Sequence, residues 1–232
     1  MKIDLVEFVR SAAGAGDLPG AGAAEVALVG RSNVGKSSLI NALFERPVAR
    51  TSRTPGKTRL LNLYRVVTRA TGEFYLVDLP GYGYAKKEAR GEFDRLAAAY
   101  FGRAAEARRD RWSEVGGHRL PSTGHDSVPI GVLLALDARH PGMENDLATL
   151  AWLRDRRFDP FVVVNKIDKL PASERRQALG RFGQVFGEPV LAVSAATGEG
   201  MGELWKQIVS WVVSTTERSQ RAATAPPGTR RP

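Results

Sequence analysis

Short apolar runs alternate with amphipathic stretches along most of this 232-residue chain. The first run, residues 25–30, predicts a buried strand, and apolar positions with a helical period follow at residues 36–44. The same reasoning predicts strands over residues 61–67, 73–77, 130–136, 161–164 and 189–193, and helices over residues 89–108, 143–154, 172–182 and 199–213. This alternation is typical of an α/β domain with a mainly parallel sheet wrapped by helices.

One pair of predicted strands departs from the parallel arrangement. Residues 61–67 and 73–77 are separated by only about five residues, which suffices for a hairpin but is too short for a parallel crossover. We therefore expect one antiparallel hairpin in an otherwise parallel sheet. Ligands of such sheets bind at the carboxyl ends of the strands, and the motifs described below lie at such positions.

Residues 24–213 form the predicted globular domain. Residues 1–23 are rich in Gly and Ala and predict a flexible arm with one short amphipathic piece at residues 3–9. Residues 110–127 contain three glycines, one proline and two histidines. We interpret them as an inserted flexible loop, with a metal or RNA site as the alternative. Residues 214–232 predict a disordered basic tail.

Composition narrows the possible classes of function. The chain has no cysteine, which excludes disulfides and thiolate metal sites, and its three histidines show no metal-ligand spacing. No apolar run is long enough to cross a bilayer, and the N-terminal acidic residues fit neither a secretory nor a transit signal. We therefore expect a cytoplasmic protein without a membrane segment. The net charge of +9 favours contact with polyanions, or is simply the solvated surface of a basic protein.

A complete phosphate loop lies between the first predicted strand and the first predicted helix. Its pattern, Gly-x4-Gly-Lys-Ser, is formed by Gly30, Arg31, Ser32, Asn33, Val34, Gly35, Lys36 and Ser37. The glycines let successive main-chain N–H groups point at phosphate oxygens, and the start of the helix adds the positive end of its dipole. Lys36 brings a positive charge to the outer phosphates, and the Ser37 hydroxyl is a Mg²⁺ ligand. This loop alone does not distinguish ATP from GTP.

A second motif predicts that the base is guanine. It follows the strand at residues 161–164 and consists of Asn165, Lys166, Ile167 and Asp168. Guanine presents two adjacent donors, N1–H and the exocyclic amine, and the Asp168 carboxylate accepts from both. Adenine would leave that carboxylate unpaired, at a cost of ~1–3 kcal/mol or more. A further contact with the base, through a main-chain N–H, is predicted at Val193, Ser194 and Ala195.

Two other loops complete the predicted nucleotide site. After the hairpin come Asp78, Leu79, Pro80 and Gly81. The carboxylate holds the Mg²⁺ shell through water, and the Gly81 N–H meets the third phosphate, which makes the following loop sensitive to that phosphate. The other loop contributes Gly56, Lys57, Thr58, Arg59 and Leu60. Thr58 is the expected second protein ligand of Mg²⁺, with Thr51 and Thr54 as alternatives that spacing does not exclude. Lys36 and Thr58 are the predicted catalytic residues.

Together these motifs resemble the EngB family (also called YihA or YsxC) of bacterial ribosome-assembly GTPases, within the TrmE-Era-EngA-EngB-septin-like group. The resemblance rests on GRSNVGKSSLINAL at residues 30–43, RTSRTPGKTRLLNLY at 50–64, LVDLPGYGYAK at 76–86 and LDARHP at 136–141. It implies a Ras-like domain with a six-stranded mixed sheet and Mg²⁺ on Ser37 and Thr58. It also implies a role in assembly of the large (50S) ribosomal subunit and an association with cell division and septation. The family commonly has Thr in place of Asn165, and the insertion and basic tail are extra.

Tyr82 follows Gly81, where well-studied switch GTPases place a Gln that orients the attacking water. Tyrosine does not act in the same way, which predicts slow intrinsic hydrolysis, on the order of 10⁻³ s⁻¹ or less. A charge supplied by a partner would compensate, as would a K⁺ ion held beside the phosphates by Asn33. The alternative for Asn33 is that it only braces the loop.

The expected ligands are GTP and GDP, and the expected partner of a monomeric protein is the large ribosomal subunit with its RNA. The basic residues on the two loops expected to change with the nucleotide are Arg53, Lys57, Arg59, Lys86 and Lys87. They either form a face for ribosomal RNA or are solvated charges. The alternative function is a regulatory switch of the division machinery whose partner is a protein, without a direct ribosomal role.

Overall fold

The computed structural model describes residues 3–18, 24–51, 60–83, 87–110, 112–115, 118–121, 129–187 and 189–224. The elements in chain order are β1 (Ile3–Ala12), η1 (Ala15–Asp17), β2 (Glu25–Gly30), α1 (Lys36–Phe44), β3 (Leu61–Thr68), β4 (Gly72–Asp78), α2 (Lys87–Asp110), β5 (Trp112–Val115), β6 (His118–Pro121), β7 (Pro129–Asp137), α3 (Glu144–Asp155), β8 (Phe161–Asn165), η2 (Ile167–Lys169), α4 (Ala172–Phe186), β9 (Leu191–Ala192) and α5 (Met201–Thr224). Within these residues, none of the helices combines the length and the apolar character that a membrane span requires.

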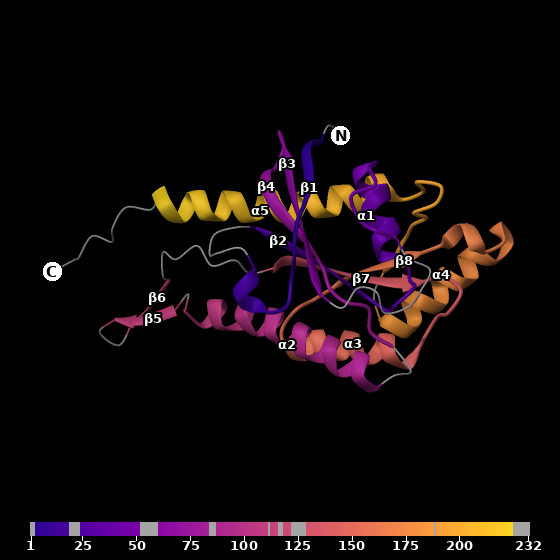
Figure 1. Ribbon diagram of the computed structural model, residues 1–232, viewed down its shortest axis with the longest axis horizontal. Coiled ribbons are helices and arrows are strands. Elements are labelled where there is room, and N and C mark those ends of the chain that lie inside the picture. The colour runs from indigo at the N-terminus through magenta and orange to yellow at the C-terminus, as the bar shows by residue number, and fades with distance from the viewer. Residues whose placement is uncertain are drawn as a thin grey trace.

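One seven-stranded sheet, in the order β1-β3-β4-β2-β7-β8-β9, runs through the centre of the molecule (Figure 1). The neighbours from β4 to β9 pair in parallel, whereas β1 with β3 and β3 with β4 pair antiparallel. The α/β class, the mostly parallel sheet and the antiparallel hairpin are therefore confirmed. The expected six strands are wrong by one, because an additional strand lies at the edge next to β3.

That additional strand is β1, within the segment expected to be a flexible arm. It pairs with β3 from Ile3 opposite Thr68 to Ala12 opposite Leu61, so the expectation of flexibility is wrong for residues 3–12. In this strand only Val6 and Ala12 are buried, so its burial does not alternate as in a half-buried strand. The main-chain ladder holds the strand to β3, together with side-chain contacts such as the Glu7–Arg65 ion pair.

Two other segments have more secondary structure than expected. α5 continues to Thr224, so the predicted disorder from residue 214 is wrong as far as that residue. Residues 110–127, expected to be an irregular loop, contain the antiparallel pair β5 and β6, which forms a separate two-stranded sheet. The boundaries proposed for the domain stay predictions.

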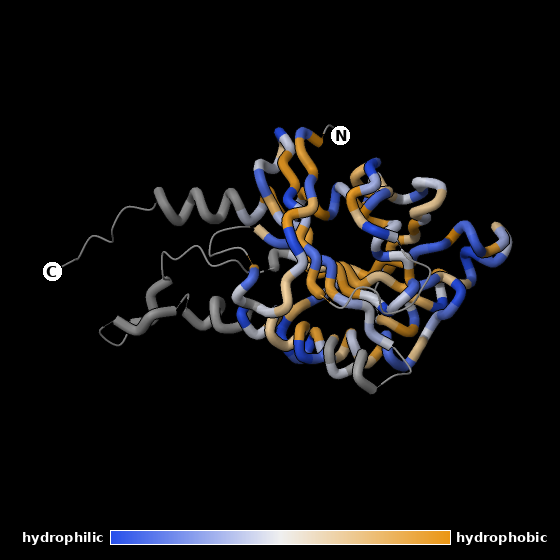
Figure 2. The backbone as a smooth tube through the Cα atoms, in the orientation of Figure 1, coloured by the Kyte–Doolittle hydropathy of each residue, from blue (hydrophilic) through white to orange (hydrophobic). Residues whose placement is uncertain are grey.

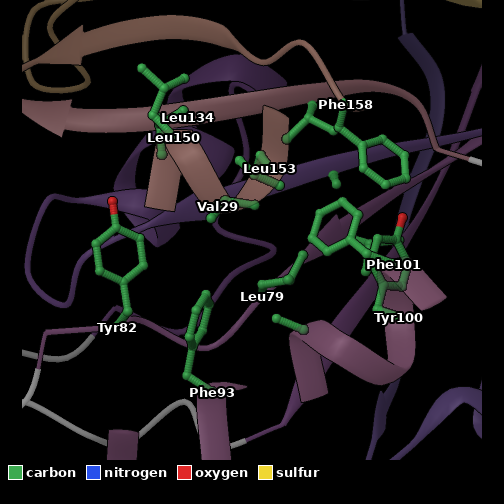
Figure 3. Close-up of a cluster of buried hydrophobic side chains, with 14 of the residues drawn as sticks. Val29, Leu79, Tyr82, Phe93, Tyr100, Phe101, Leu134, Leu150, Leu153 and Phe158 are labelled. Carbon is green, nitrogen blue, oxygen red and sulfur yellow. The ribbon is translucent and has the colours of Figure 1, made fainter. Parts of the chain in front are cut away.

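Helices cover both faces of the sheet and divide its apolar residues into two cores. α1 and α5 lie on one face, and α2 and α3 lie on the other (Figure 1). In β2, which is buried throughout, Val26 and Leu28 join the core beneath α1 and α5, whereas Ala27 and Val29 join the core beneath α2, α3 and α4 (Figure 3). The central strands are correspondingly the most hydrophobic part of the chain (Figure 2). A strand with apolar side chains on both faces must be central, which fixes β2 there.

The carboxyl ends of the central parallel strands lie next to one another, along one edge of the sheet that runs across the strands. Leu28 is opposite Asp78, Gly30 is opposite Ala135, and Asp137 is opposite Asn165. Because β2, β4, β7 and β8 are parallel, the loops that follow them are neighbours in space although they are distant in sequence. This edge therefore brings the predicted motifs together.

Candidate nucleotide-binding site

The phosphate loop joins the end of β2 to the start of α1 through a tightly curled main chain. Asn33 and Gly35 have positive φ angles of 65° and 94°. Gly35 is the N-cap of α1, and a Cβ added to it would lie 2.7 Å from Nδ2 of Asn165. The conformation and the close neighbour both require glycine at this position. The motif predicted from sequence thus has the strand–loop–helix setting that phosphate binding needs.

Lys36, the first residue of α1, is buried and turned back towards the loop. Its side chain donates from Nζ to the main-chain oxygen of Gly30 at 3.0 Å. Burial lowers the pKa of Lys36, and the negative charge of Asp78 partly offsets this. A buried cation held beside the phosphate loop is suited to receive phosphate oxygens.

Asp78, the last residue of β4, is the carboxylate that faces this lysine. Burial raises its pKa to about 6, although Lys36 and a hydrogen bond from Asn62 partly offset the effect. Its Oδ1 is buried and has no hydrogen-bond partner among the residues that the structure describes. An unpartnered carboxylate oxygen that interacts electrostatically with Lys36, the residue before the half-buried Ser37, fits Mg²⁺, which prefers oxygen ligands and retains part of its water shell.

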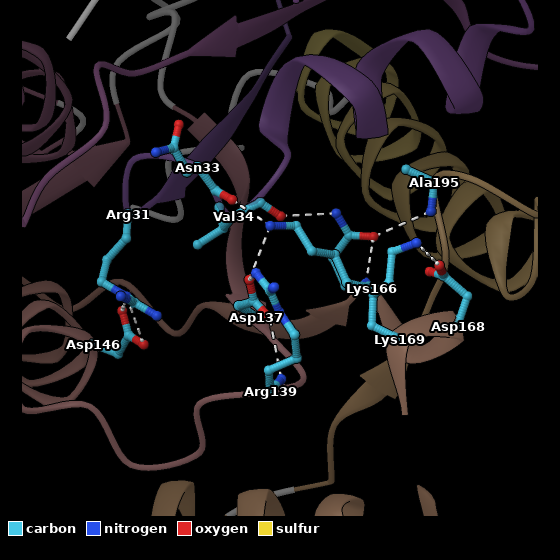
Figure 4. Close-up of polar contacts among 11 residues, drawn as sticks. Arg31, Asn33, Val34, Asp137, Arg139, Asp146, Lys166, Asp168, Lys169 and Ala195 are labelled. Atoms are coloured by element: carbon cyan, nitrogen blue, oxygen red, sulfur yellow. Dashed lines mark hydrogen bonds and ion pairs between the residues drawn. The ribbon is translucent and has the colours of Figure 1, made fainter. Parts of the chain in front are cut away.

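Two adjacent residues connect the guanine motif to the phosphate loop (Figure 4). Asn165 donates from Nδ2 to the main-chain oxygen of Val34 at 2.9 Å, and its Oδ1 accepts from the N–H of Ala195 at 3.1 Å. Lys166 donates from Nζ to the main-chain oxygen of Asn33. Asn165 thereby joins three loops that are far apart in the sequence: its own loop, the phosphate loop and the loop that contains Ala195.

Asp168 is held in place by the loop that follows β9. The buried Ser194 donates from Oγ to Asp168 Oδ1 at 2.7 Å, and this hydrogen bond lowers the pKa of Asp168. The same Oγ accepts from the main-chain N–H of Thr197 at 3.1 Å. The Asp168 carboxylate is therefore charged at neutral pH and fixed in orientation, as recognition of two adjacent donors requires.

Asp137, at the end of β7, is a residue of this site that sequence reasoning did not single out. It accepts from Lys166 Nζ at 2.9 Å and from Arg139 Nη2 at 2.7 Å (Figure 4). Burial alone would raise the pKa of Asp137, but the hydrogen bonds from Arg139 and Lys166 hold it well below its ordinary value. One feature of the sequence could have indicated Asp137: it directly follows a predicted buried strand and lies two residues before an arginine.

Tyr82, which follows Gly81, is turned into the protein (Figure 3). It is 4% exposed, its hydroxyl donates to Asp146 Oδ1 at 2.9 Å, and its ring lies 5.3 Å from that of Phe93. Asp146, in the first turn of α3, also accepts from Nε of Arg31 at 3.0 Å (Figure 4). Acidic residues are common in the first turn of a helix, so no pattern in the sequence singled out Asp146.

The predicted residues that the structure brings together lie in four loops at one edge of the sheet: 30–37, 78–81, 165–168 and 193–195. Gly56, Lys57, Thr58 and Arg59 lie outside the described residues, as do Arg53, Thr54 and Lys86, while Leu60 and Lys87 lie within them. Thr58 as a Mg²⁺ ligand and catalytic residue therefore stays a prediction, and so does each nucleotide contact.

A phosphate loop after a central strand, the buried Asp78 at the end of the neighbouring strand and an Asn-Lys-x-Asp loop bonded to the phosphate loop define a P-loop GTP-binding domain. The family described as "50S ribosome-binding GTPase" matches residues 25–166. A relative from Thermotoga maritima, "Probable GTP-binding protein EngB", is 40% identical over 205 residues, which cover 86% of this chain and 92% of the relative. The relative of that name from Pelotomaculum thermopropionicum is 40% identical over 217 residues, covering 91% and 98%. The chain belongs to the EngB family of GTP-binding proteins, and it is a GTPase.

Solved structures agree with this fold. The crystal structure of a probable GTP-binding protein EngB has a TM-score of 0.57 at 18% identity, and the alignment covers 82% of this chain and 99% of that one. Era in complex with MgGDPNP and nucleotides 1506–1542 of 16S ribosomal RNA has a TM-score of 0.60 at 23% identity, covering 82% of this chain and 57% of Era. At these identities the likeness concerns the fold.

Proposed function

We propose that this GTPase is a nucleotide-controlled factor in the assembly of the large ribosomal subunit, and that normal cell division and septation depend on it. The observation that carries the proposal is the match to a family described as ribosome-binding over residues 25–166, which include the whole phosphate loop and part of the guanine motif. The net charge of +9 supports contact with ribosomal RNA. Era, which has a related fold, was solved with a segment of ribosomal RNA.

The nucleotide is GTP or GDP, recognised through its base by Asp168 and through its phosphates by residues 30–37. The Ser194 hydrogen bond, which keeps the Asp168 carboxylate charged and oriented, supports this role. Ser37 and Thr58 would hold Mg²⁺, with Asp78 in its water shell. The ion supplies positive charge that offsets the charge developing on the phosphates during hydrolysis. The unpartnered Oδ1 of Asp78 supports this assignment.

Intrinsic hydrolysis is slow, because no side chain at position 82 is available to orient water. The burial of Tyr82 and its bond to Asp146 support this statement. A partner that supplies a charge, or a K⁺ ion beside Asn33, would increase the rate. The protein acts as a cytoplasmic monomer in this proposal, and the basic loops that flank the nucleotide form the ribosomal face when GTP is bound.

Co-sedimentation with purified large ribosomal subunits tests the nucleotide control. We expect binding with a non-hydrolysable GTP analogue, weak binding with GDP or without nucleotide, and a decrease as salt increases because phosphate contacts release counterions. The Asp168→Ala variant serves as control, since it should no longer respond to the analogue. Binding that ignores the nucleotide would contradict the switch.

Depletion of the protein in its own cell distinguishes the two functions. Accumulation of immature large subunits in sucrose gradients supports the assembly role. Normal ribosome profiles accompanied by a division defect would contradict it and favour a switch whose partner is a protein of the division machinery.

A further inference from the structure

Asp146 of α3 contacts two loops of the nucleotide site from the side of the protein core. Its carboxylate, 0% exposed, accepts from the Tyr82 hydroxyl at 2.9 Å and pairs with Arg31 Nε at 3.0 Å. Arg31 is the second residue of the phosphate loop, and Tyr82 comes directly after Gly81. One buried carboxylate therefore ties both loops to the same helix, across 115 and 64 positions of the sequence.

The two loops also contact each other through their main chains. The N–H of Ser32 donates to the oxygen of Tyr82 at 3.0 Å, and Arg31 and Tyr82 form an isolated parallel bridge. A Cβ added to Gly81 would lie 2.4 Å from Ser32 Oγ and 2.8 Å from the Ser32 main-chain nitrogen. Gly81 is thus held against the phosphate loop, close to where the outer phosphates of a nucleotide would lie.

The position of this main chain depends on how the Tyr82 side chain is anchored. Its ring packs on Phe93 of α2, and its hydroxyl makes a bond to a buried carboxylate. Hydrogen bonds to charged groups are stronger than neutral ones, and in a buried site they also fix geometry. Loss of the hydroxyl would free one end of the anchor while the ring remained packed.

We propose that Asp146 is a positioning residue for the third phosphate: through Tyr82 it holds Gly81 beside the phosphate loop and so sets how much more tightly GTP binds than GDP. GDP lacks the phosphate that the Gly81 N–H would meet, so its affinity does not depend on this anchor. A contact changes the relative affinity for two ligands only if it interacts more strongly with one ligand than with the other. The inference rests on the proposed role of Gly81 in GTP binding and is independent of the ribosomal role.

The test compares Tyr82→Phe with Tyr75→Phe. Both changes remove a hydroxyl that is hydrogen-bonded to a carboxylate, but Tyr75 lies in β4 and its partner, Glu73 at 3.2 Å, is exposed. Affinities for GDP and for a non-hydrolysable GTP analogue are measured by equilibrium fluorescence titration with Mg²⁺. We expect Tyr82→Phe to lose about fivefold to tenfold in affinity for the analogue and to keep its GDP affinity within about twofold. Tyr75→Phe should change neither.

Asp146→Ala should reproduce the selective loss. Because this change also leaves Arg31 without its carboxylate, the conservative Tyr82→Phe variant decides the question if Asp146→Ala fails to fold. Loss of affinity for both nucleotides in equal measure, or for neither, would overturn the inference while leaving the proposed function intact. A wild-type protein that binds no guanine nucleotide would remove the proposed function and the inference together.

Discussion

Nδ2 of Asn165 lies 2.9 Å from the main-chain oxygen of Val34, 131 positions earlier in the sequence. This bond connects the end of β8 with the phosphate loop, and Lys166 adds a second connection at Asn33. The guanine motif therefore has a structural role besides the recognition of the base. A change in either loop should affect the binding of both the base and the phosphates.

Asp168→Ala should abolish the preference for guanine. The variant loses the acceptor for two donors of the base, and we expect the GTP affinity to fall roughly tenfold to 100-fold while the weak ATP affinity stays the same. Asp159→Ala is the matched control, since the Asp159 side chain is 87% exposed and lies before β8 rather than after it. Competition of GTP and ATP against a fluorescent guanine nucleotide measures the result. A preference for GTP that survives in Asp168→Ala would contradict the assignment.

Gly35→Ala should weaken the connection between the two loops. The added methyl group would stand 2.7 Å from Asn165 Nδ2 at a φ of +94°, so we expect a loss of about 1–3 kcal/mol in the free energy of unfolding. GDP and GTP should both bind more weakly. Gly180→Ala is the control, because Gly180 lies in α4 with nothing within 4 Å of an added Cβ. It should stabilise the protein by up to about 1 kcal/mol. Urea unfolding of both variants measures the difference, and equal effects would contradict the prediction.

Most of the fold could be predicted from the sequence because its central strands are unambiguous. In β2 and β8, apolar residues are followed directly by loop motifs, and the predicted limits of the first strand and first helix are those of β2 and α1. β1 could not be predicted in the same way. Only two of its residues are buried, and its stability depends on pairing with β3, roughly 50 to 65 residues later in the chain, which no local pattern reports.

In the candidate site, too, residues that belong to a short motif could be predicted from the sequence, whereas residues that depend on distant partners could not. Short motifs marked the phosphate loop and Asp168, because the chemistry of each motif is contained in a few consecutive residues. Asp137 and Asp146 each act on partners from distant parts of the chain, and alone each looks like an ordinary acidic residue at the end of a strand or the start of a helix. The sequence indicated that Tyr82 is a poor substitute for Gln but not that its side chain is buried.

Asp78 should make the nucleotide-free protein less stable as pH rises. Its pKa is raised from 3.8 to about 6 in the folded state, so the unfolded chain releases this proton first. The neutral Asp78 carboxyl makes its full contribution to the free energy of unfolding below about pH 3.8. This contribution decreases between about pH 3.8 and pH 6 and is lost above about pH 6. Asp78→Asn stays neutral, and near pH 7.5 we expect it to exceed the wild type in free energy of unfolding by up to about 3 kcal/mol.

Urea unfolding of both proteins near pH 4 and pH 7.5, without nucleotide or Mg²⁺, measures this difference. Because Glu25 and Asp146 also have raised pKa values, only the difference between variant and wild type isolates Asp78. An equal difference at both pH values would contradict the prediction. With Mg²⁺ and GTP present the order should reverse, since the carboxylate is then needed for the ion's water shell.

A potassium site at Asn33 predicts faster GTP turnover in KCl than in NaCl at equal ionic strength. The Asn33 side chain is exposed and points away from Lys166, while its main-chain oxygen accepts from that lysine (Figure 4). Asn33→Ala should remove the difference between the salts, whereas any loss of GDP affinity through the phosphate loop should be the same in KCl and NaCl. Phosphate release under saturating GTP measures both proteins. Equal rates of the wild type in the two salts would contradict a potassium site and would indicate that Asn33 only stabilises the loop.

β1 also protects the outer side of β3, which would otherwise present a row of free N–H and C=O groups. Such an edge recruits strands from other molecules. A version of the chain shortened past Ala12 would therefore tend to associate through intermolecular β-pairing. Its first defect would be poor solubility, and the nucleotide site at the carboxyl ends of the central strands would be affected only afterwards.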